Sequence, residues 1–380
     1  MIIINKAIIA IAALALCALA VSCGKTHQLM HAAEDNNTFE VARLIAEGVN
    51  VNAKDWTGET ALAAAAWTNA VDVAKMLIAA GADVDKRSYG CRDTALMCAA
   101  YKDAADVAKV LIEAGADVNA KNKYGITALR QTTWDNAAGI AKLLIEAGAD
   151  VNAREYDGDT ALIHAAWHKS TDVARLLIEA GADVNAANDD GYTALMRTAE
   201  KDAADAAQLL IESGADINAK DNYGNTALVY AARENAADVA RLLIETGADM
   251  NAKDGRTALM YTAWNNATDV MRLLIESGVD VKHDDGATAL MWAAAGNAPD
   301  AAKLLIESGV DVNAENDDGE TPLMRAAWHN AADAAKLLIE MGADVNATDN
   351  DGKTALMLAK ENDAADVIAL LKTAGAKTEE

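Results

Sequence analysis

A motif that recurs about every 33 residues dominates this sequence of 380 residues. It begins with the triplet Thr-Ala-Leu, or once Thr-Pro-Leu, and its threonines are Thr60, Thr94, Thr127, Thr160, Thr193, Thr226, Thr257, Thr288, Thr321 and Thr354. Successive threonines are 33 or 34 residues apart, except before Thr257 and Thr288, where the gap is 31. His27 occupies the same register in a first unit. A fixed period of this length predicts a solenoid, in which each unit packs on its neighbours.

Each unit has the pattern of two short antiparallel helices and a projecting turn. In the second unit Thr60 is a favoured N-cap residue. The first helix then presents an inward face: Leu62, Ala65 and Ala66. The second helix presents an apolar stripe: Val73, Met76, Leu77 and Ala80. Gly81 ends this helix, and we expect it in the left-handed conformation. We predict an all-α solenoid of about eleven units with projecting β-turn fingers, covering residues 27–380.

The repeat resembles that of the ankyrin repeat family. The unit most similar to the family pattern reads Thr-Pro-Leu-Met at residues 321–324 and Met-Gly-Ala-Asp-Val-Asn at residues 341–346. In the other threonine-led units Ala replaces the family's Pro, and Met mostly replaces its following His. The family's Gly-His between the helices is often Asn-Ala, as at residues 69–70. These changes keep volume or turn chemistry, so they affect local hydrogen bonding and not the fold.

The first 22 residues read as an export signal. A head containing Lys6 precedes an apolar run from Ala7 to Val21, shorter than the about 20 apolar residues of a transmembrane helix. Residues 20–23, Ala-Val-Ser-Cys, resemble the bacterial lipobox. That resemblance implies a signal peptide over residues 1–22, lipidation of Cys23 and a tether over residues 23–26. We therefore expect an exported chain, anchored by lipid to a bacterial membrane at its periplasmic face or the cell surface. Cleavage after Ala20 is the alternative, and it would release a soluble protein.

Charge and cysteine content exclude several classes of protein. The formal net charge is −25, so the chain cannot readily form the basic face that nucleic acid requires. Cys91 and Cys98 are the cysteines outside the export segment, too few for a disulfide-dense scaffold or a four-cysteine zinc site. They either pair in an oxidising compartment or remain separate thiols. We expect a monomer without metal or cofactor.

Patterns of enzyme and metal chemistry are weak in this sequence. The turns at residues 316–319 and 349–352 lack the distal Glu of a calcium-binding EF-hand, and Asx-Gly turn chemistry explains them. His164 and His168 are four residues apart, and His329 is expected on the same surface, but no third ligand accompanies them. Neither a nucleophile elbow nor a phosphate-binding glycine loop is present. We predict that the protein is not an enzyme.

Aromatic residues occupy fixed positions within the repeat. One group stands seven residues after the repeat threonine: Trp67, Tyr101, Trp134, Trp167, Trp264 and Trp328. A second stands at the projecting turn: Trp56, Tyr89, Tyr124, Tyr156, Tyr192 and Tyr223. Further candidates stand four residues after the threonine: Tyr230, Tyr261 and Trp292. The family resemblance implies binding through the turns and the adjacent face of the first helix, so we predict that these rings line a concave protein-binding groove. In the alternative interpretation, the rings only cover the helix junctions of neighbouring units.

The later units differ from the earlier ones. The turns at Gly255 and Gly286 are two residues shorter, which we expect to lower the wall of the groove. Residues 284–285 and 317–318 are Asp pairs in turns without aromatic residues, so this half fits either a basic or amphipathic partner or a solvated acidic surface. The predicted function is a non-catalytic, membrane-tethered scaffold that binds a protein through its aromatic groove. The alternative is a secreted soluble protein that acts on a protein of a host or neighbouring cell.

Overall fold

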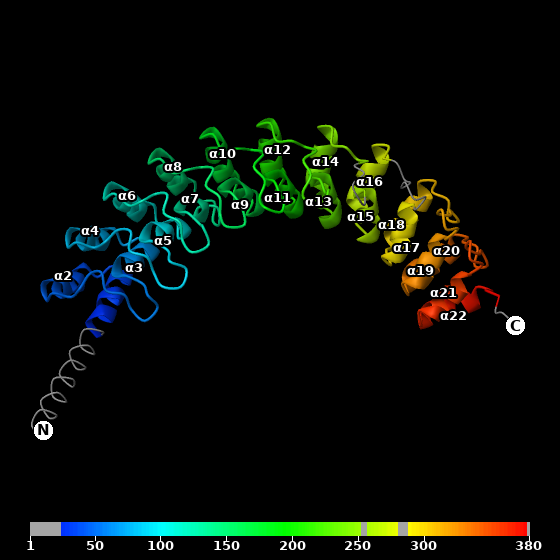
Figure 1. Cartoon of the computed structure of the whole chain (residues 1–380), viewed down its shortest axis with the longest axis horizontal. Helices are drawn as coiled ribbons and strands as arrows, with labels where there is room; N and C mark the ends of the chain where they lie inside the picture. The colour runs from blue at the N-terminus through cyan, green and yellow to red at the C-terminus, as the bar shows by residue number, and fades with distance from the viewer. Residues whose placement is uncertain (1–23, 252–256, 280–287, 378–380) are drawn as a thin grey trace, which may run out of the picture. The chain divides into compact units, whose positions relative to one another are not determined.

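The computed structural model describes residues 24–251, 257–279 and 288–377. Within these ranges the chain forms helices, turns and isolated β-bridges, and no strand. The helices come in pairs, one pair to a repeat, as the sequence period predicts (Figure 1). The chain divides between Asp189 and Asp190 into two compact units, called here the N-terminal and C-terminal units.

In the N-terminal unit, residues 24–34 form the first helix of the first repeat. The first helices of the next repeats are α3 (Ala61–Trp67), α5 (Ala95–Tyr101), α7 (Ala128–Gln131) and α9 (Ala161–Trp167). The second helices are α2 (Thr38–Ala46), α4 (Val71–Ala79), α6 (Ala105–Glu113), α8 (Ala138–Glu146) and α10 (Thr171–Glu179).

In the C-terminal unit, the first helices are α11 (Ala194–Lys201), α13 (Ala227–Glu234), α15 (Ala258–Trp264), α17 (Ala289–Ala295), α19 (Pro322–Trp328) and α21 (Ala355–Glu361). The second helices are α12 (Ala204–Glu212), α14 (Ala237–Glu245), α16 (Thr268–Glu276), α18 (Pro299–Glu307), α20 (Ala332–Glu340) and α22 (Ala365–Thr373).

The repeat threonine starts the first helix, as predicted. Thr60 has extended backbone angles, and its hydroxyl accepts a hydrogen bond from the backbone N–H of Ala63 at 3.2 Å. The methionine that replaces the family's histidine takes part in the cap in two repeats. The N–H of Thr321 donates to Sδ of Met324 at 3.4 Å, and the N–H of Thr354 donates to Sδ of Met357 at 3.3 Å. The substitution therefore keeps a reciprocal cap, with sulfur as the acceptor.

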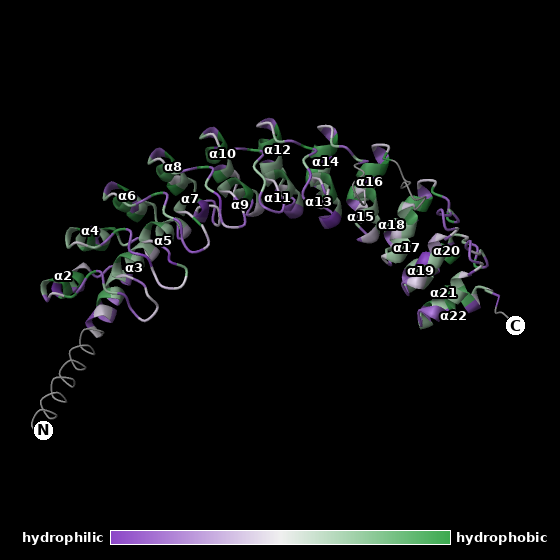
Figure 2. Ribbon diagram, in the orientation of Figure 1, coloured by the Kyte–Doolittle hydropathy of each residue, from purple (hydrophilic) through white to green (hydrophobic). Residues whose placement is uncertain are grey.

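The core lies between the two helices of a repeat and the helices of its neighbours. In α5, residues 95–100 are all buried, because this helix packs on α3, α6 and α7 together. The sequence pattern predicted a single inward face for the first helix, so the burial of its whole circumference corrects that prediction. The alanine-rich composition allows such close packing on several sides. Hydrophobic residues follow the helices, and hydrophilic residues follow the turns and helix ends (Figure 2).

The predicted apolar stripe of the second helix is confirmed in part. Val73 and Leu77 are fully buried in α4, but Met76 is only half-buried. Ala80 is exposed, because α4 ends at Ala79 and Ala80 is its C-cap. Gly81 follows with a φ of 89°, the left-handed conformation expected at a helix end.

The asparagine between the two helices caps a helix of the next repeat. Asn69 has a φ of 54°, and its Oδ1 accepts a hydrogen bond from the N–H of Val107 at 3.1 Å, while its Nδ2 donates to Asp106 at 3.3 Å. The N-cap residue of α6, Ala104, makes no side-chain cap bond, so the cap comes from the preceding repeat. The same bond recurs from Asn136, Asn235, Asn266 and Asn297. The sequence predicted the turn chemistry of this residue but not its contact with the neighbouring repeat.

A second asparagine joins consecutive repeats at the projecting turn. Asn52 accepts a hydrogen bond from the N–H of Asp83 at 2.7 Å and donates to the carbonyl of Gly81 at 2.9 Å. Asn119 and Asn152 repeat both bonds two and three units further on, within the N-terminal unit. In the N-terminal unit these two asparagines thus join consecutive repeats at both ends of a second helix.

Several sequence predictions fall outside the described residues. These are the export signal, Cys23, the shortened turns at Gly255 and Gly286, and the Asp pair at residues 284–285. Among the described helices, none is long and apolar enough to cross a membrane. Of the two cysteines left open for pairing, Cys91 is exposed and Cys98 is buried, and both are free thiols.

Candidate protein-interaction surface

Four rings from consecutive repeats of the N-terminal unit form a continuous row. Trp67 and Tyr101 are the last residues of α3 and α5, and their ring centroids are 5.8 Å apart. Trp134 follows α7, and its centroid lies 6.3 Å from that of Tyr101. His168, the C-cap of α9, extends the series, with its ring 4.2 Å from Trp134. We call these residues the aromatic row.

Cations lie over the rings of the aromatic row. Nζ of Lys102 is 4.6 Å from the ring centroid of Trp67 and 5.3 Å from that of Tyr101. The guanidinium carbon of Arg130 is 5.4 Å from the centroid of Trp134. Such contacts hold a ring in place and contribute about 0.5 to 1 kcal/mol at an exposed site. Contacts within the chain therefore favour the observed positions of these rings.

The rings of the row remain partly exposed although they contact one another. The exposed fractions of Trp67, Tyr101 and Trp134 are 37%, 36% and 45%. Contacts with neighbouring residues therefore cover only part of each ring, and the exposed part is available to bind another protein. Trp167, predicted in the same group, is the last residue of α9 and is half-buried. In this repeat the ring that contacts Trp134 is that of the next residue, His168.

The corresponding aromatic residues of the C-terminal unit do not form one row. Trp264 ends α15, is half-buried, and lies 6.0 Å, centroid to centroid, from both Trp292 and His329. Trp328 ends α19 and is 47% exposed. Burial and the cation of Arg325 lower the pKa of His329. The first helices α11, α13, α17 and α21 end in other residues, so the predicted aromatic positions are interrupted here.

Tyr230 was a candidate binding residue, and the structure contradicts that prediction. Its side chain is fully buried in α13, and its hydroxyl donates a hydrogen bond to Asp221 of the preceding turn. Burial, with the hydrogen bond to Asp221, raises the pKa of the phenol. Tyr230 therefore holds the turn to the helix. Tyr261 and Trp292, the other candidates at this position, are half-buried.

The turn aromatics are the more exposed group. The exposed fractions reach 85% for Trp56, 74% for Tyr156 and 72% for Tyr223, and Tyr89 and Tyr124 are about half exposed. Tyr192 is the exception, because it is half-buried against the ring of Tyr230, with their centroids 5.1 Å apart.

Tyr89 is held by the preceding turn. Its N–H donates to the carbonyl of Gly58, and Nζ of Lys54 lies 4.5 Å from its ring centroid. A Cβ atom at Gly58 would lie 2.1 Å from Cγ of Tyr89, and the φ of this glycine is 84°, so no other residue fits there.

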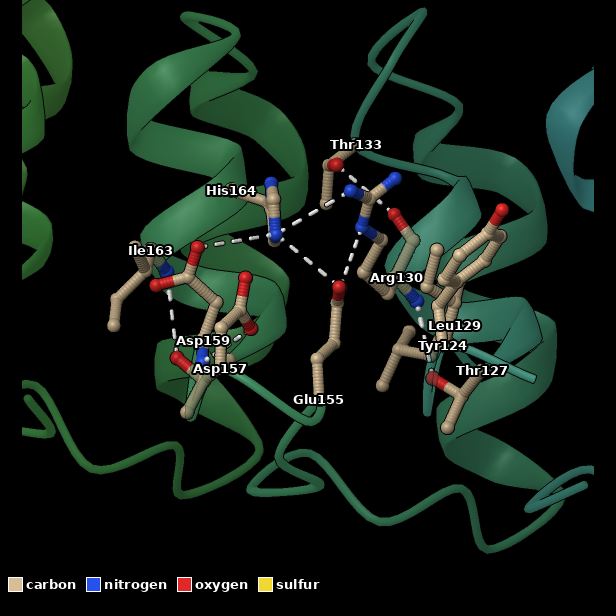
Figure 3. A network of polar contacts seen from close by, with 12 residues as sticks. Tyr124, Thr127, Leu129, Arg130, Thr133, Glu155, Asp157, Asp159, Ile163 and His164 are labelled. Carbon is tan, nitrogen blue, oxygen red and sulfur yellow. Dashed lines mark hydrogen bonds and ion pairs between the residues drawn. The ribbon is translucent and has the colours of Figure 1, made fainter. Parts of the chain in front are cut away.

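A buried polar cluster connects the repeats that contain α7 and α9, and the sequence did not predict it (Figure 3). Nε of Arg130 donates to Oε1 of Glu155 at 2.7 Å. Nε2 of His164 lies 3.2 Å from the same oxygen, 3.5 Å from Asp159 and 3.3 Å from a terminal nitrogen of Arg130. All four side chains are 15% exposed or less. Arg130 stands where most repeats have Met, which is the one signal of this cluster in the sequence.

The cluster coincides with a distortion of α7. This helix has four residues, where the first helices of the other threonine-led repeats have seven or eight. The hydroxyl of Thr132 donates to the carbonyl of Leu129, and that of Thr133 donates to the carbonyl of Arg130. These bonds compete with the continuation of the helix. The polar side chains of the cluster contact one another, which indicates a structural role.

In the acidic turns of the C-terminal unit, the first side chain accepts hydrogen bonds from backbone N–H groups of the same turn. Oδ1 of Asn316 accepts hydrogen bonds from the N–H groups of Asp318 and Glu320, and Asp349 makes the same pair of bonds in the next repeat. These bonds confirm the predicted Asx turns. In the parts of the chain that the structure describes, no three His, Cys, Asp or Glu side chains are placed to hold a metal ion.

Paired helices at a fixed period, joined by projecting turns and inter-repeat caps, define a helical solenoid of short repeats. The family of ankyrin repeats in three copies matches residues 9–88, 29–122, 80–155, 96–188, 182–254 and 251–316, and that of ankyrin repeats in many copies matches residues 305–359. The chain belongs to the ankyrin repeat family, as the resemblance indicated, and its fold is an all-α ankyrin solenoid. Proteins of this family generally act as non-catalytic scaffolds that bind other proteins.

Two curated proteins are similar to parts of the chain. A segment is 45% identical over 82 residues to a mitochondrial disaggregase of Homo sapiens, and another match is 49% identical over 59 residues to that of Bos taurus. These matches cover 19% and 16% of this chain, and 12% and 9% of the relatives. The chain thus spans about a tenth of the length of these proteins, and the likeness concerns the repeats.

Proposed function

We propose that this protein is a non-catalytic scaffold that binds one protein partner through the aromatic row and the adjacent turns of its N-terminal unit. The observation that carries this proposal is the row itself: rings of four consecutive repeats in contact, with Trp67, Tyr101 and Trp134 still more than a third exposed. Rigid aromatic side chains next to cations are the typical anchors of protein interfaces. Their contacts with one another and with these cations restrict the rings and so lower the entropy cost of binding.

The turn aromatics extend this surface. Trp56, Tyr89, Tyr124 and Tyr156 lie in successive turns of the same unit and are at least half exposed. The net charge of −25 disfavours nucleic acid as the ligand, so the proposed partner is a protein. The predicted sites Trp167, Tyr192, Tyr223, Trp264 and Trp328 are secondary in this proposal, because they are less exposed or stand outside the row.

Site-specific photo-cross-linking in the source cell tests the binding surface. A photoreactive amino acid replaces Tyr101 in one variant and Phe39 in another. Phe39 is the matched control, because it is 80% exposed but lies on α2, a second helix outside the row. We expect one discrete cross-linked protein from position 101 and none from position 39. Equal cross-linking from both positions would refute the assignment.

We also propose that lipid on Cys23 tethers the scaffold to a bacterial membrane. The support is the sequence Ala-Val-Ser-Cys at residues 20–23 after an apolar run. Metabolic labelling with a fatty acid tests this proposal. We expect label in the parent chain and in a Cys17→Ser variant, and none in a Cys23→Ser variant. If the parent remains unlabelled and its mature form begins at Val21, the alternative of a secreted soluble protein replaces the tethered one.

A further inference from the structure

The first repeat carries two histidines whose ring nitrogens lie close together. His27 and His31 lie one turn apart on the helix of residues 24–34, and both side chains are exposed. Their Nε2 atoms are 3.0 Å apart, and their ring centroids are 4.3 Å apart at an interplanar angle of 75°. Both residues are exposed within the described part of the chain, so ligands from solvent can reach them.

A carboxylate fixes the orientation of one of these rings. Nδ1 of His31 lies 3.1 Å from Oε2 of Glu34. A carboxylate in that position accepts the Nδ1 proton, so the Nε2 lone pair points away from Glu34 and toward His27. Metal-binding histidines usually have this arrangement, with the second ring nitrogen bonded to a carboxylate or carbonyl.

The spacing of the two Nε2 atoms fits a shared metal ion. An imidazole nitrogen lies about 2.0 to 2.1 Å from a bound divalent metal. Two such ligands at a right angle are about 2.8 to 3.0 Å apart, and two at a tetrahedral angle are about 3.3 to 3.4 Å apart. The observed 3.0 Å agrees with the right angle of a square or octahedral site, the geometry that Cu²⁺ and Ni²⁺ prefer.

We propose that His27 and His31 bind a divalent transition metal ion, with Cu²⁺ bound most tightly, and that Glu34 is the carboxylate that orients His31. The protein supplies two ligands, and water occupies the remaining positions. The ion takes the place of the contact between the two Nε2 atoms in the metal-free chain. This proposal departs from the expectation of no metal, which considered His164, His168 and His329.

The second pair of histidines shows that spacing alone does not make such a site. His164 and His168 are also four residues apart, but their rings are near-parallel at 15°, with centroids 6.2 Å apart. Nε2 of His164 already contacts Glu155 and Arg130, and the arginine cation repels a metal ion. The ring of His168 contacts that of Trp134, with their centroids 4.2 Å apart. This pair therefore provides a control for the first.

Titration of the full-length chain with Cu²⁺ tests the proposal. We compare the parent with His27→Gln, His31→Gln and His168→Gln variants by calorimetry, after circular dichroism shows that each variant folds as the parent does. We expect one tight site in the parent and in the His168→Gln variant, and affinity at least tenfold lower in the other two. Unchanged affinity in the His27→Gln and His31→Gln variants overturns the proposal.

Electron paramagnetic resonance of the bound Cu²⁺ identifies its ligands directly. We expect superhyperfine coupling to two imidazole nitrogens in the parent and to fewer in the His31→Gln variant. The same two-nitrogen signal in the His31→Gln variant overturns the proposal. Loss of the Glu34 carboxylate in a Glu34→Gln variant should lower Cu²⁺ affinity by about tenfold, the usual effect of removing a carboxylate that orients a ligand.

Discussion

Replacing Arg130 with Met removes a buried cation and installs the residue that most other repeats have at this position. The side chains of Arg130 and Glu155 are only 11% and 9% exposed, and the atoms that join them are 2.7 Å apart. Breaking a buried ion pair by removing one partner costs about 3 to 5 kcal/mol, because the remaining charge stays buried. His164, 3.2 Å from Glu155, compensates part of this loss, so we expect the lower value, about 3 kcal/mol.

The double variant Arg130→Met with Glu155→Asn separates the charge from the packing. Most other repeats have Asp or Asn at the position of Glu155, including Asn122 and Asn188. Removing both members of a buried pair is often neutral or stabilising, so we expect the double variant within about 1 kcal/mol of the parent.

Peptide-resolved hydrogen exchange measures the local stability of α7 and α9 in both variants. An opening that becomes easier by about 3 kcal/mol increases exchange in α7 and α9 by about 100-fold in the Arg130→Met variant. The double variant should exchange at nearly the parent rate. If the single variant changes exchange less than fivefold, or the double variant is as unstable as the single one, the reasoning about the buried charge is wrong.

Three further predictions test other parts of the fold. Asn69→Ala loses the cap to the next repeat and puts Ala in a left-handed conformation. It should therefore lower the free energy of unfolding, measured with urea, by about 2 to 3 kcal/mol. Asn69→Gly loses only the cap and should cost about 1 kcal/mol, and equal losses would contradict this account. Burial, with neighbouring carboxylates, raises the pKa of Glu59, so its ionised form destabilises the folded state at neutral pH. Glu59→Gln should therefore stabilise the chain by a few tenths of a kcal/mol at pH 7, and the gain should vanish as the pH falls below about 4, where the carboxyl is protonated in both states. A gain that persists at pH 3 would argue against a charge effect. Burial raises the pKa of Cys98 to about 12, so alkylation of the native chain at pH 8 should modify the exposed Cys91 and spare Cys98 until urea is added, as peptide mass spectrometry can show. Equal modification of both thiols would refute the prediction that burial protects Cys98.

The sequence was sufficient to predict the elements of the fold. The spacing of the threonines gave the repeat, Thr60 gave the helix start, and Gly81 gave the helix end, because caps and helix ends depend on one residue and its own backbone. The extent of burial was not predictable in the same way. Residues 95–100 are buried on every side because two neighbouring repeats and a second helix cover them, and a helical periodicity records only one face.

The candidate surface was predictable in its positions but not in its contacts. The sequence placed Trp67, Tyr101 and Trp134 at equivalent positions, and the structure brings their rings together. His168 and Lys102 join them through geometry that spacing does not specify. The sequence also suggested Tyr230 as a further candidate, but this residue is buried and donates a hydrogen bond to Asp221 nine residues earlier. The buried cluster around Arg130 was missed because its four members come from two repeats and fit no motif.

The affinity of the purified partner for two alanine variants tests the central claim most directly. Tyr101→Ala removes the middle ring of the row, and Phe39→Ala removes a more exposed ring from α2. Because central aromatic anchors contribute about 2 kcal/mol or more to binding, Kd should rise at least tenfold for Tyr101→Ala and less than twofold for Phe39→Ala. Equal affinities of both variants and the parent would place the partner elsewhere on the solenoid.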